Sequence, residues 1–188
     1  MVAVGIGSAV SILKGRGQAG LALGTNEASL LRQCADNIAA HGLPQYATLA
    51  RALLAKGIWR RARPDDQYIR EEDQSGDTVY AYTLSNGKHP SAIVLAPRFF
   101  TEDLSLAARS SYMIHEMGHY QAYVATGKST EFDGYKAQYD AAKSLGLSET
   151  DGLVYFMMLD GVQEYVVPID PSYGRKADVR SYIQQSGT

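Results

Sequence analysis

Apolar residues recur at helical spacing in two stretches near the start of the chain. In the stretch from Asn26 to His41 they stand three or four positions apart, and Gly42 and Pro44 follow as helix breakers. The stretch from Gln45 to Ala55 repeats the pattern and ends before Gly57. The spacing therefore predicts two consecutive helices.

The pattern changes to that of short strands between residues 68 and 96. Asp, Gly, Asn and Pro separate runs that are rich in β-branched and aromatic residues. These runs are Tyr68–Arg70, Thr78–Leu84 and Ala92–Ala96. Ser85-Asn86-Gly87 has the composition of a tight turn between two of them. A small, mostly antiparallel sheet made largely of hairpins is predicted.

Helical periodicity returns after the last of these strands and continues to about Thr126. Thr101 is the expected N-cap, because Glu102 and Asp103 follow it and suit the positive end of a helix dipole. Gly127 is typical of a C-terminal stop. This predicted segment, residues 101–126, is the central helix of the expected fold.

Two further helices are expected after the central helix. The first runs from Glu131 to Leu145, with Ser129 or Thr130 as its cap and Gly146 at its end. The second runs from about Glu149 to Val167. Together the elements predict an α+β domain in which a small sheet packs on the central helix, with further helices before and after it.

The composition is that of a folded globular domain. The chain has 188 residues, of which 45% are apolar and 20% are charged. The formal net charge is −2 and the basic residues form no extended stripe, which argues against nucleic acid as a partner. Residues 1–24 contain six glycines and are expected to form a flexible lead-in or linker, with residues 25–188 as a single domain.

Neither a transmembrane segment nor a signal peptide is predicted. Met1–Leu13 is apolar, but glycines interrupt it, it is too short to span a bilayer, and it lacks a basic start. Cys34 is the only cysteine, which excludes an internal disulfide and a metal cluster held by several thiolates. Its helical spacing with Leu30, Leu31 and Ile38 predicts a core position.

The central helix contains the sequence His115-Glu116-Met117-Gly118-His119. Residues four apart on a helix lie one turn above each other, so the two imidazoles face the same way, about 6 Å apart along the axis. Two neutral imidazoles suit a zinc ion. Glu116 stands one residue from that line and can act as general base on a water molecule at the metal. The motif predicts one catalytic Zn²⁺ site.

The residues around the motif favour a buried site. Tyr112-Met113-Ile114 and Tyr120–Val124 are largely apolar, and burying a glutamate and two histidines among them is costly without a cation. The alternative is a surface helix with two solvated histidines. Gly118 weakens a helix by about 1 kcal/mol relative to alanine, which predicts that another segment approaches closely there.

A catalytic zinc ion needs a third protein ligand and an open position. Glu164 is the preferred candidate, because it interrupts a helix that is apolar on most sides. Gly161 would let this helix approach the central helix, and Asp160 could orient a ligand histidine. The alternative for Glu164 is a charge that reaches solvent at the helix end.

Glu131 is the alternative third ligand. The run Glu131-Phe132-Asp133-Gly134-Tyr135 resembles the Glu-x-x-Ala helices that supply this ligand in several peptidase families. The expected geometry disfavours Glu131, because the central helix advances about 10 Å beyond His119 before the chain returns. Asp133 and Asp140 are weaker candidates.

Two segments, Ala92–Phe100 and Ser111–Gln121, resemble the strand and active-site helix of the gluzincin metallopeptidases. More narrowly, they are similar to the metallopeptidase domains of bacterial toxins, including the C-terminal effector domains of VgrG spike proteins in type VI secretion. The resemblance implies a zincin fold in which an edge strand beside the helix, here Ala92–Ala96, binds an extended protein or peptide substrate. It also implies a protein that is secreted, or that a secretion-system protein delivers into a target cell. No Asn-Glu-x-x-Ser-Asp signature follows the helix, so the resemblance does not supply the third ligand.

The sequence therefore predicts a zinc metallopeptidase that hydrolyses peptide bonds and serves as an effector or toxin domain. Two alternatives stay open: a non-catalytic interaction module stabilised by a metal, and a regulatory protease with one cellular target. Several side chains could steady an oxyanion, namely His89, Tyr155, Tyr165 and Tyr173. His41 is expected only to interact with the end of its own helix.

Overall fold

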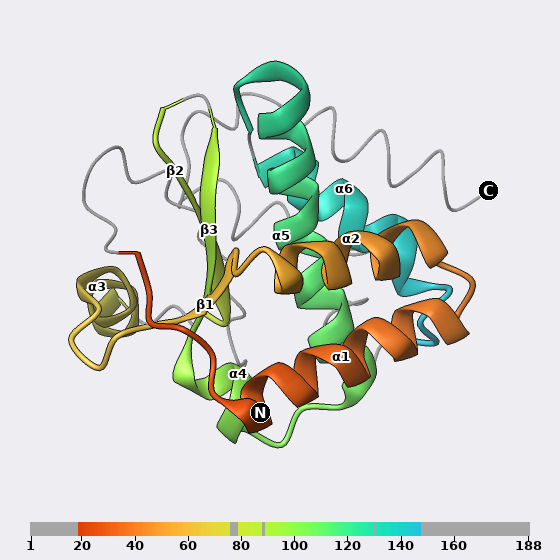
Figure 1. The fold of residues 1–188 in the computed structure, drawn as a ribbon, viewed down its shortest axis with the longest axis horizontal. Helices are drawn as coiled ribbons and strands as arrows, with labels where there is room; N and C mark the ends of the chain where they lie inside the picture. The colour runs from red at the N-terminus through yellow and green to blue at the C-terminus, as the bar shows by residue number, and fades with distance from the viewer. Residues whose placement is uncertain (1–18, 76–78, 88, 130, 148–188) are drawn as a thin grey trace.

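A computed structural model describes residues 19–75, 79–87, 89–129 and 131–147 of the chain (Figure 1). These residues form an α+β fold of helices around a small sheet. In chain order the elements are α1 (Thr25–Ala40), α2 (Pro44–Ala55), β1 (Trp59–Arg61), α3 (Gln67–Ser75), β2 (Ala81–Ser85), β3 (Pro90–Leu95), α4 (Pro97–Thr101), α5 (Leu106–Thr126) and α6 (Glu131–Ala142). The two predicted N-terminal helices are confirmed as α1 and α2.

The sheet has the strand order β1-β3-β2. The antiparallel pair β2–β3 is the predicted hairpin, and its turn is closed by a 3.0 Å hydrogen bond from the Asn86 amide to the His89 carbonyl. Gly87 has a φ of 103°, which only glycine adopts without strain. β1 pairs with β3 in parallel, so the sheet, predicted to be mostly antiparallel, is mixed. The pattern did not predict β1, because three residues are too few to show alternation.

The run Tyr68–Arg70, predicted as a strand, lies in α3 instead. Asp66 accounts for the difference: its carboxylate Oδ1 accepts from the Ile69 amide at 3.2 Å, and its carbonyl accepts from the Arg70 amide at 3.2 Å. An acidic side chain that caps the first turn outweighs the weak strand preference of three residues.

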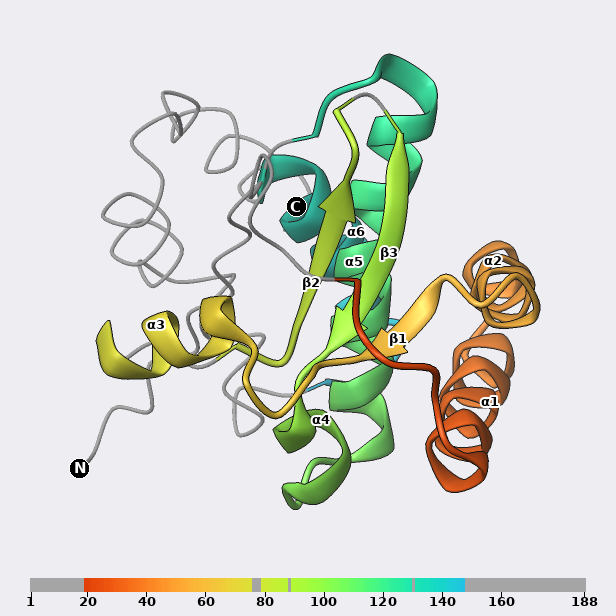
Figure 2. The same cartoon turned by 60° about the vertical axis from the view of Figure 1, so that its left-hand side comes forward.

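Helix α5 lies along one face of the sheet (Figure 2), and the two faces contribute to different apolar clusters. Ile93 and Leu95 of β3 belong to the larger apolar cluster, which joins the sheet to α1, α2, α5 and α6. Ala92 and Val94 point the other way, into a smaller cluster that includes Tyr68 of α3. Alternate residues of one strand therefore enter different clusters, which explains why β3 is apolar at almost every position.

Helix α5 starts later than predicted. Thr101 is the last residue of the separate helix α4, and the chain is extended at Glu102 (φ −75°, ψ 155°). Ser105 is the N-cap, with its hydroxyl oxygen accepting from the Ala108 amide at 3.0 Å. The Arg109 guanidinium donates to the carbonyls of Phe99 and Glu102 at 2.9 and 2.6 Å, and also to the carbonyl of Leu104. These bonds satisfy backbone groups where the helical ladder is interrupted.

The predicted C-terminal end of α5 is confirmed, whereas α6 ends at Ala142, three residues before the predicted Leu145. Gly127 follows α5 with a φ of 70°, and Gly146 follows the turn after α6 with a φ of 67°. The helix predicted from Glu149 to Val167 lies outside the described residues.

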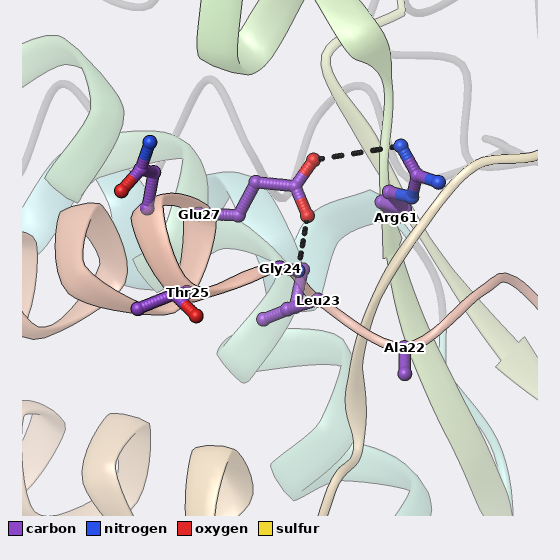
Figure 3. A pocket seen from close by; sticks show the side chains of 7 residues that line it. Ala22, Leu23, Gly24, Thr25, Glu27 and Arg61 are labelled. Atoms are coloured by element: carbon purple, nitrogen blue, oxygen red, sulfur yellow. Dashed lines mark hydrogen bonds and ion pairs between the residues drawn. The ribbon is translucent and has the colours of Figure 1, made fainter.

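The last part of the predicted lead-in lies against the sheet. Leu21 forms an isolated antiparallel bridge with Arg61 through hydrogen bonds of 2.8 and 3.0 Å. Figure 3 shows how α1 begins beside this bridge: the Glu27 carboxylate turns back to accept from the Gly24 amide at 2.6 Å, and an Arg61 nitrogen lies 3.9 Å from the other carboxylate oxygen. A hollow of about 450 Å³ is lined by these residues and contains no residue of the histidine motif.

In the described part of the chain, no helix is both long enough and apolar enough to cross a membrane.

Replacing Ser105 with alanine should lower the free energy of unfolding by about 1 kcal/mol, because one amide at the start of α5 loses its acceptor. Urea denaturation of the two proteins measures this difference. Thr101→Ala is the matched control: Thr101 is exposed and its hydroxyl bonds only to Pro97 within α4, so its loss should be within about 0.5 kcal/mol. A larger loss at position 101 than at 105 would show that Thr101 caps the helix.

Candidate active site

Helix α5 buries all three polar side chains of the motif. The exposed fractions of His115, Glu116 and His119 are 2%, 2% and 1%. The two imidazoles face each other with their Nε2 atoms 3.1 Å apart. The alternative of a surface helix with two solvated histidines is therefore wrong. His115 and His119 form what we call the histidine pair.

The tautomer of His115 follows from its partner on α6. Its Nδ1 atom lies 3.1 Å from the side-chain oxygen Oε1 of Gln138, which is also buried. An amide oxygen only accepts hydrogen bonds, so Nδ1 of His115 carries the proton and donates. The neutral ring then has an unprotonated Nε2 atom, whose lone pair points toward His119.

The tautomer of His119 is set by a two-step chain of hydrogen bonds. The Ser129 hydroxyl donates to the Asp133 carboxylate at 3.2 Å. Because its single proton is used there, the same hydroxyl oxygen accepts from Nδ1 of His119 at 2.8 Å. Nε2 of His119 is therefore also unprotonated. Asp133 thus acts on His119 through Ser129, as an orienting carboxylate often does behind a metal ligand.

With the proton of each ring on Nδ1, the lone pairs of the two Nε2 atoms face each other across 3.1 Å in a buried environment. A cation that accepts both of them stabilises this arrangement, whereas two neutral acceptors alone repel. Two nitrogens bound to one tetrahedral zinc ion at about 2.0–2.1 Å are about 3.3–3.4 Å apart, which is close to the observed distance. The histidine pair fits a zinc ion.

Burial also keeps both imidazoles in the form that binds a metal. Desolvation lowers the pKa of His115 below its ordinary value. The pKa of His119 is lowered well below its ordinary value, first by desolvation and then by the neighbouring charge of His115. Both rings are therefore neutral near physiological pH, with lone pairs available for coordination.

Gly134 of α6 packs directly against the histidine pair. A Cβ atom at this position would lie 2.6 Å from the Nε2 atoms of both His115 and His119. Gly118 of α5 is in a similar situation, because a Cβ atom there would lie 2.6 Å from the Asp133 carbonyl oxygen. The close approach predicted from Gly118 is confirmed, and the approaching segment is α6.

Glu116 is oriented by the sheet. The Thr83 hydroxyl on β2 donates to the Glu116 carboxylate oxygen Oε2 at 2.7 Å, and Thr83 is itself buried. The general-base candidate and the histidine pair therefore share α5 but are supported from different sides. β2 contacts the carboxylate, and the segment from Ser129 to Gln138 contacts the imidazoles.

The strand expected to bind substrate is not an edge strand. β3 lies between β1 and β2, so both of its edges are already paired, and β2 is the outer strand next to Glu116. Ala96 donates to the Tyr80 carbonyl, which shows that the main-chain groups of Tyr80 face β3. The main-chain groups of successive residues in a strand point to opposite edges. The amide and carbonyl of Thr83, three residues after Tyr80, therefore point away from β3.

Among the described residues, no group of three or more His, Cys, Asp and Glu side chains is gathered for a metal. Asp133 accepts from Ser129, and Asp140 pairs with Lys136 at 2.9 Å on the surface, so the structure gives both carboxylates other roles. Glu164 lies outside the described residues, as do Asp160, Gly161, Tyr155, Tyr165 and Tyr173.

The chain returns to the histidine pair soon after α5. The left-handed Gly127 ends the helix, Ser129 bonds to His119, and Gly134 faces the histidine pair. Glu131 precedes Gly134 by three residues, so both positions lie on the same face of α6.

The remaining sequence candidates have ordinary roles in the described structure. His41 is exposed and its Nδ1 atom lies 2.8 Å from the Asn37 carbonyl, at the end of α1 as expected. His89 lies in the β2–β3 turn and is exposed. Cys34 is fully buried, and desolvation raises the pKa of its thiol to about 12, which makes it an unreactive core residue.

Comparisons with protein-family models, curated proteins and solved structures found no match for this chain. The chemistry of the site therefore has to support the functional conclusion. The sequence did not single out Thr83, Ser129 or Gln138 as partners of the motif, since an isolated hydroxyl or amide carries no recognisable spacing.

Replacing Gly134 with alanine should abolish zinc uptake, because the added methyl group would occupy the space in front of both Nε2 atoms. Elemental analysis of the purified proteins measures the zinc content, and circular dichroism on the same samples reports folding. Gly42→Ala is the matched control, with a left-handed φ of 75° and no atom within 4 Å of the added carbon. It should lose some stability and keep zinc. A folded Gly134→Ala protein with full zinc content would contradict the proposed metal position.

Proposed function

We propose that this chain is a zinc-dependent metallopeptidase in which His115 and His119 are metal ligands and Glu116 is the general base. The observation that supports it best is the buried pair of Nε2 atoms, which lie 3.1 Å apart and against which Gly134 of α6 packs without room for a Cβ atom. The buried carboxylate of Glu116, next to His115 on the same helix, supplies the general base that peptide hydrolysis needs.

The chemistry that a bound zinc ion supplies is polarisation of the scissile carbonyl and acidification of a water molecule. The carboxylate of Glu116 accepts the proton of this water as it attacks the carbonyl carbon. It then delivers the proton to the leaving amine. Gln138 and Ser129 hold the two imidazoles in the tautomer that presents Nε2 to the metal.

We favour Glu131 as the third ligand and keep Glu164 as the alternative. Glu131 and Gly134 share one face of α6, and this face meets the histidine pair. Glu164 is supported by the sequence argument that a carboxylate within an apolar helix needs a cation.

The substrate class we propose is an extended protein or peptide segment. β2, rather than β3, is the strand that we propose accepts it, because β2 is the outer strand of the described sheet and contacts Glu116. The role of an effector or toxin domain, secreted or delivered into a target cell by a secretion-system protein, belongs to the same proposal. It rests on the resemblance to toxin metallopeptidase domains.

A second candidate function is a non-catalytic module in which the metal only stabilises the fold. The near-complete burial of His115, Glu116 and His119 favours it, since structural zinc sites are closed to solvent. The two functions differ in the coordination shell: a structural site has four protein ligands, whereas a catalytic site keeps one position open.

Replacing Glu116 with glutamine should leave zinc content unchanged and lower peptidase activity by about 100-fold or more, because the amide cannot accept the proton. Cleavage of a mixed peptide library, read by mass spectrometry, measures the activity over many candidate sequences at once. Asp103→Asn, the same chemical change at an exposed position, should keep full activity. Equal activity of wild type and Glu116→Gln would exclude the peptidase mechanism.

The third ligand can be identified by comparing Glu131→Ala with Glu164→Ala. We expect Glu131→Ala to lose most of its zinc affinity and Glu164→Ala to retain it, as measured by competition with a chromophoric chelator. The opposite result would identify Glu164 as the ligand. Retention of wild-type affinity by both variants would exclude both residues.

A further inference from the structure

We propose that Thr83 is a positioning residue for the general base: its hydroxyl holds the carboxylate of Glu116 in the orientation that proton transfer needs. This inference rests on the proposed peptidase function. The contact joins residues that are 33 positions apart, from β2 to α5, with 2.7 Å between the Thr83 hydroxyl and Oε2 of Glu116. The hydroxyl also lies 3.4 Å from the Glu116 carbonyl oxygen, so it contacts both the main chain and the carboxylate of this residue.

The physical need for such a donor follows from burial. Glu116 is 2% exposed, and a carboxylate removed from water is costly unless donors compensate for its lost hydration. A hydrogen bond to an ionised group is short and about twice as strong as one between neutral groups. The bond to Thr83 therefore both stabilises the charged form of the base and restricts rotation of its carboxylate plane.

Thr83 is well placed to fix that orientation. It lies at the middle of β2, paired in register with Ile93 of the central strand β3. Its side chain is β-branched, which restricts the torsion that aims the hydroxyl. The side chain of Thr83, fixed by its position in the sheet, therefore restricts the orientation of the Glu116 carboxylate.

The same residue has a second property that makes the inference testable. Its amide and carbonyl point to the outer edge of the sheet, where we propose that an extended peptide binds. In this proposal the side chain of Thr83 serves proton transfer, and its main chain serves substrate binding. Removing only the hydroxyl should affect proton transfer, and hence kcat, while substrate pairing with the main chain, and hence KM, stays nearly unchanged.

A purely structural tie between β2 and α5 is the competing explanation. Tyr82, the neighbouring residue on β2, provides the control, because its hydroxyl donates to the Asp66 carboxylate at 2.6 Å on the opposite face of the sheet. Tyr82→Phe removes an equally short hydroxyl–carboxylate bond from the same strand without touching the motif. It should lower stability and leave kcat unchanged.

The test compares Thr83→Val, Thr83→Ser and Tyr82→Phe by steady-state kinetics, zinc content and thermal unfolding. Thr83→Val should lose about 10- to 100-fold in kcat, with KM within about twofold of wild type and zinc content unchanged. Thr83→Ser restores the donor and should recover most of kcat. Should Thr83→Val fail to fold, Thr83→Ala provides the same comparison with a smaller side chain.

Three results would overturn the inference: wild-type kcat in the folded variant that lacks the hydroxyl, no recovery in Thr83→Ser, or an equal loss of kcat in Tyr82→Phe. These outcomes are distinct from failure of the proposed function. If wild type and Glu116→Gln are equally inactive, the peptidase function itself fails. If Glu116→Gln is inactive while Thr83→Val matches wild type, only the role of Thr83 is refuted.

Discussion

The close packing of α6 against α5 is the constraint on which the candidate site depends. Glycines at positions 118 and 134 let the two helices approach so closely that a single additional carbon at either position would collide with the other helix. This approach brings Gln138 and the loop residue Ser129 within hydrogen-bond distance of the imidazoles. The unprotonated Nε2 atoms, which make the site suitable for a metal, are thus a consequence of backbone packing.

The site is assembled from parts of the chain that have separate physical tasks. Helix α5 supplies the histidine pair and Glu116, because residues four apart on a helix share a face. The segment from Ser129 to Gln138 sets the tautomers of the histidines, and β2 holds the carboxylate through Thr83. The histidine pair and the carboxylate are therefore supported from different sides, so that a change in one support need not disturb the other.

The fold could be predicted where local physics decides it, and not elsewhere. Helices α1 and α2 and the β2–β3 hairpin follow from periodicity, breakers and a glycine turn, all of which lie within a few residues. The parallel strand β1 pairs with a strand more than thirty residues away, and its three residues carry no pattern. The start of α5 depends on Arg109, which binds backbone carbonyls in the break after α4. Such a contact cannot be seen in periodicity.

The sequence by itself determined that His115, Glu116 and His119 stand together on one helix, since their spacing is a local property. It also indicated, through Gly118, that another segment comes close. Only the tertiary structure decided that this segment is α6 at Gly134, that both imidazoles present lone pairs, and that the strand beside the base is β2. Those facts depend on contacts between residues far apart in the chain, which are fixed by packing rather than by the spacing of residue types.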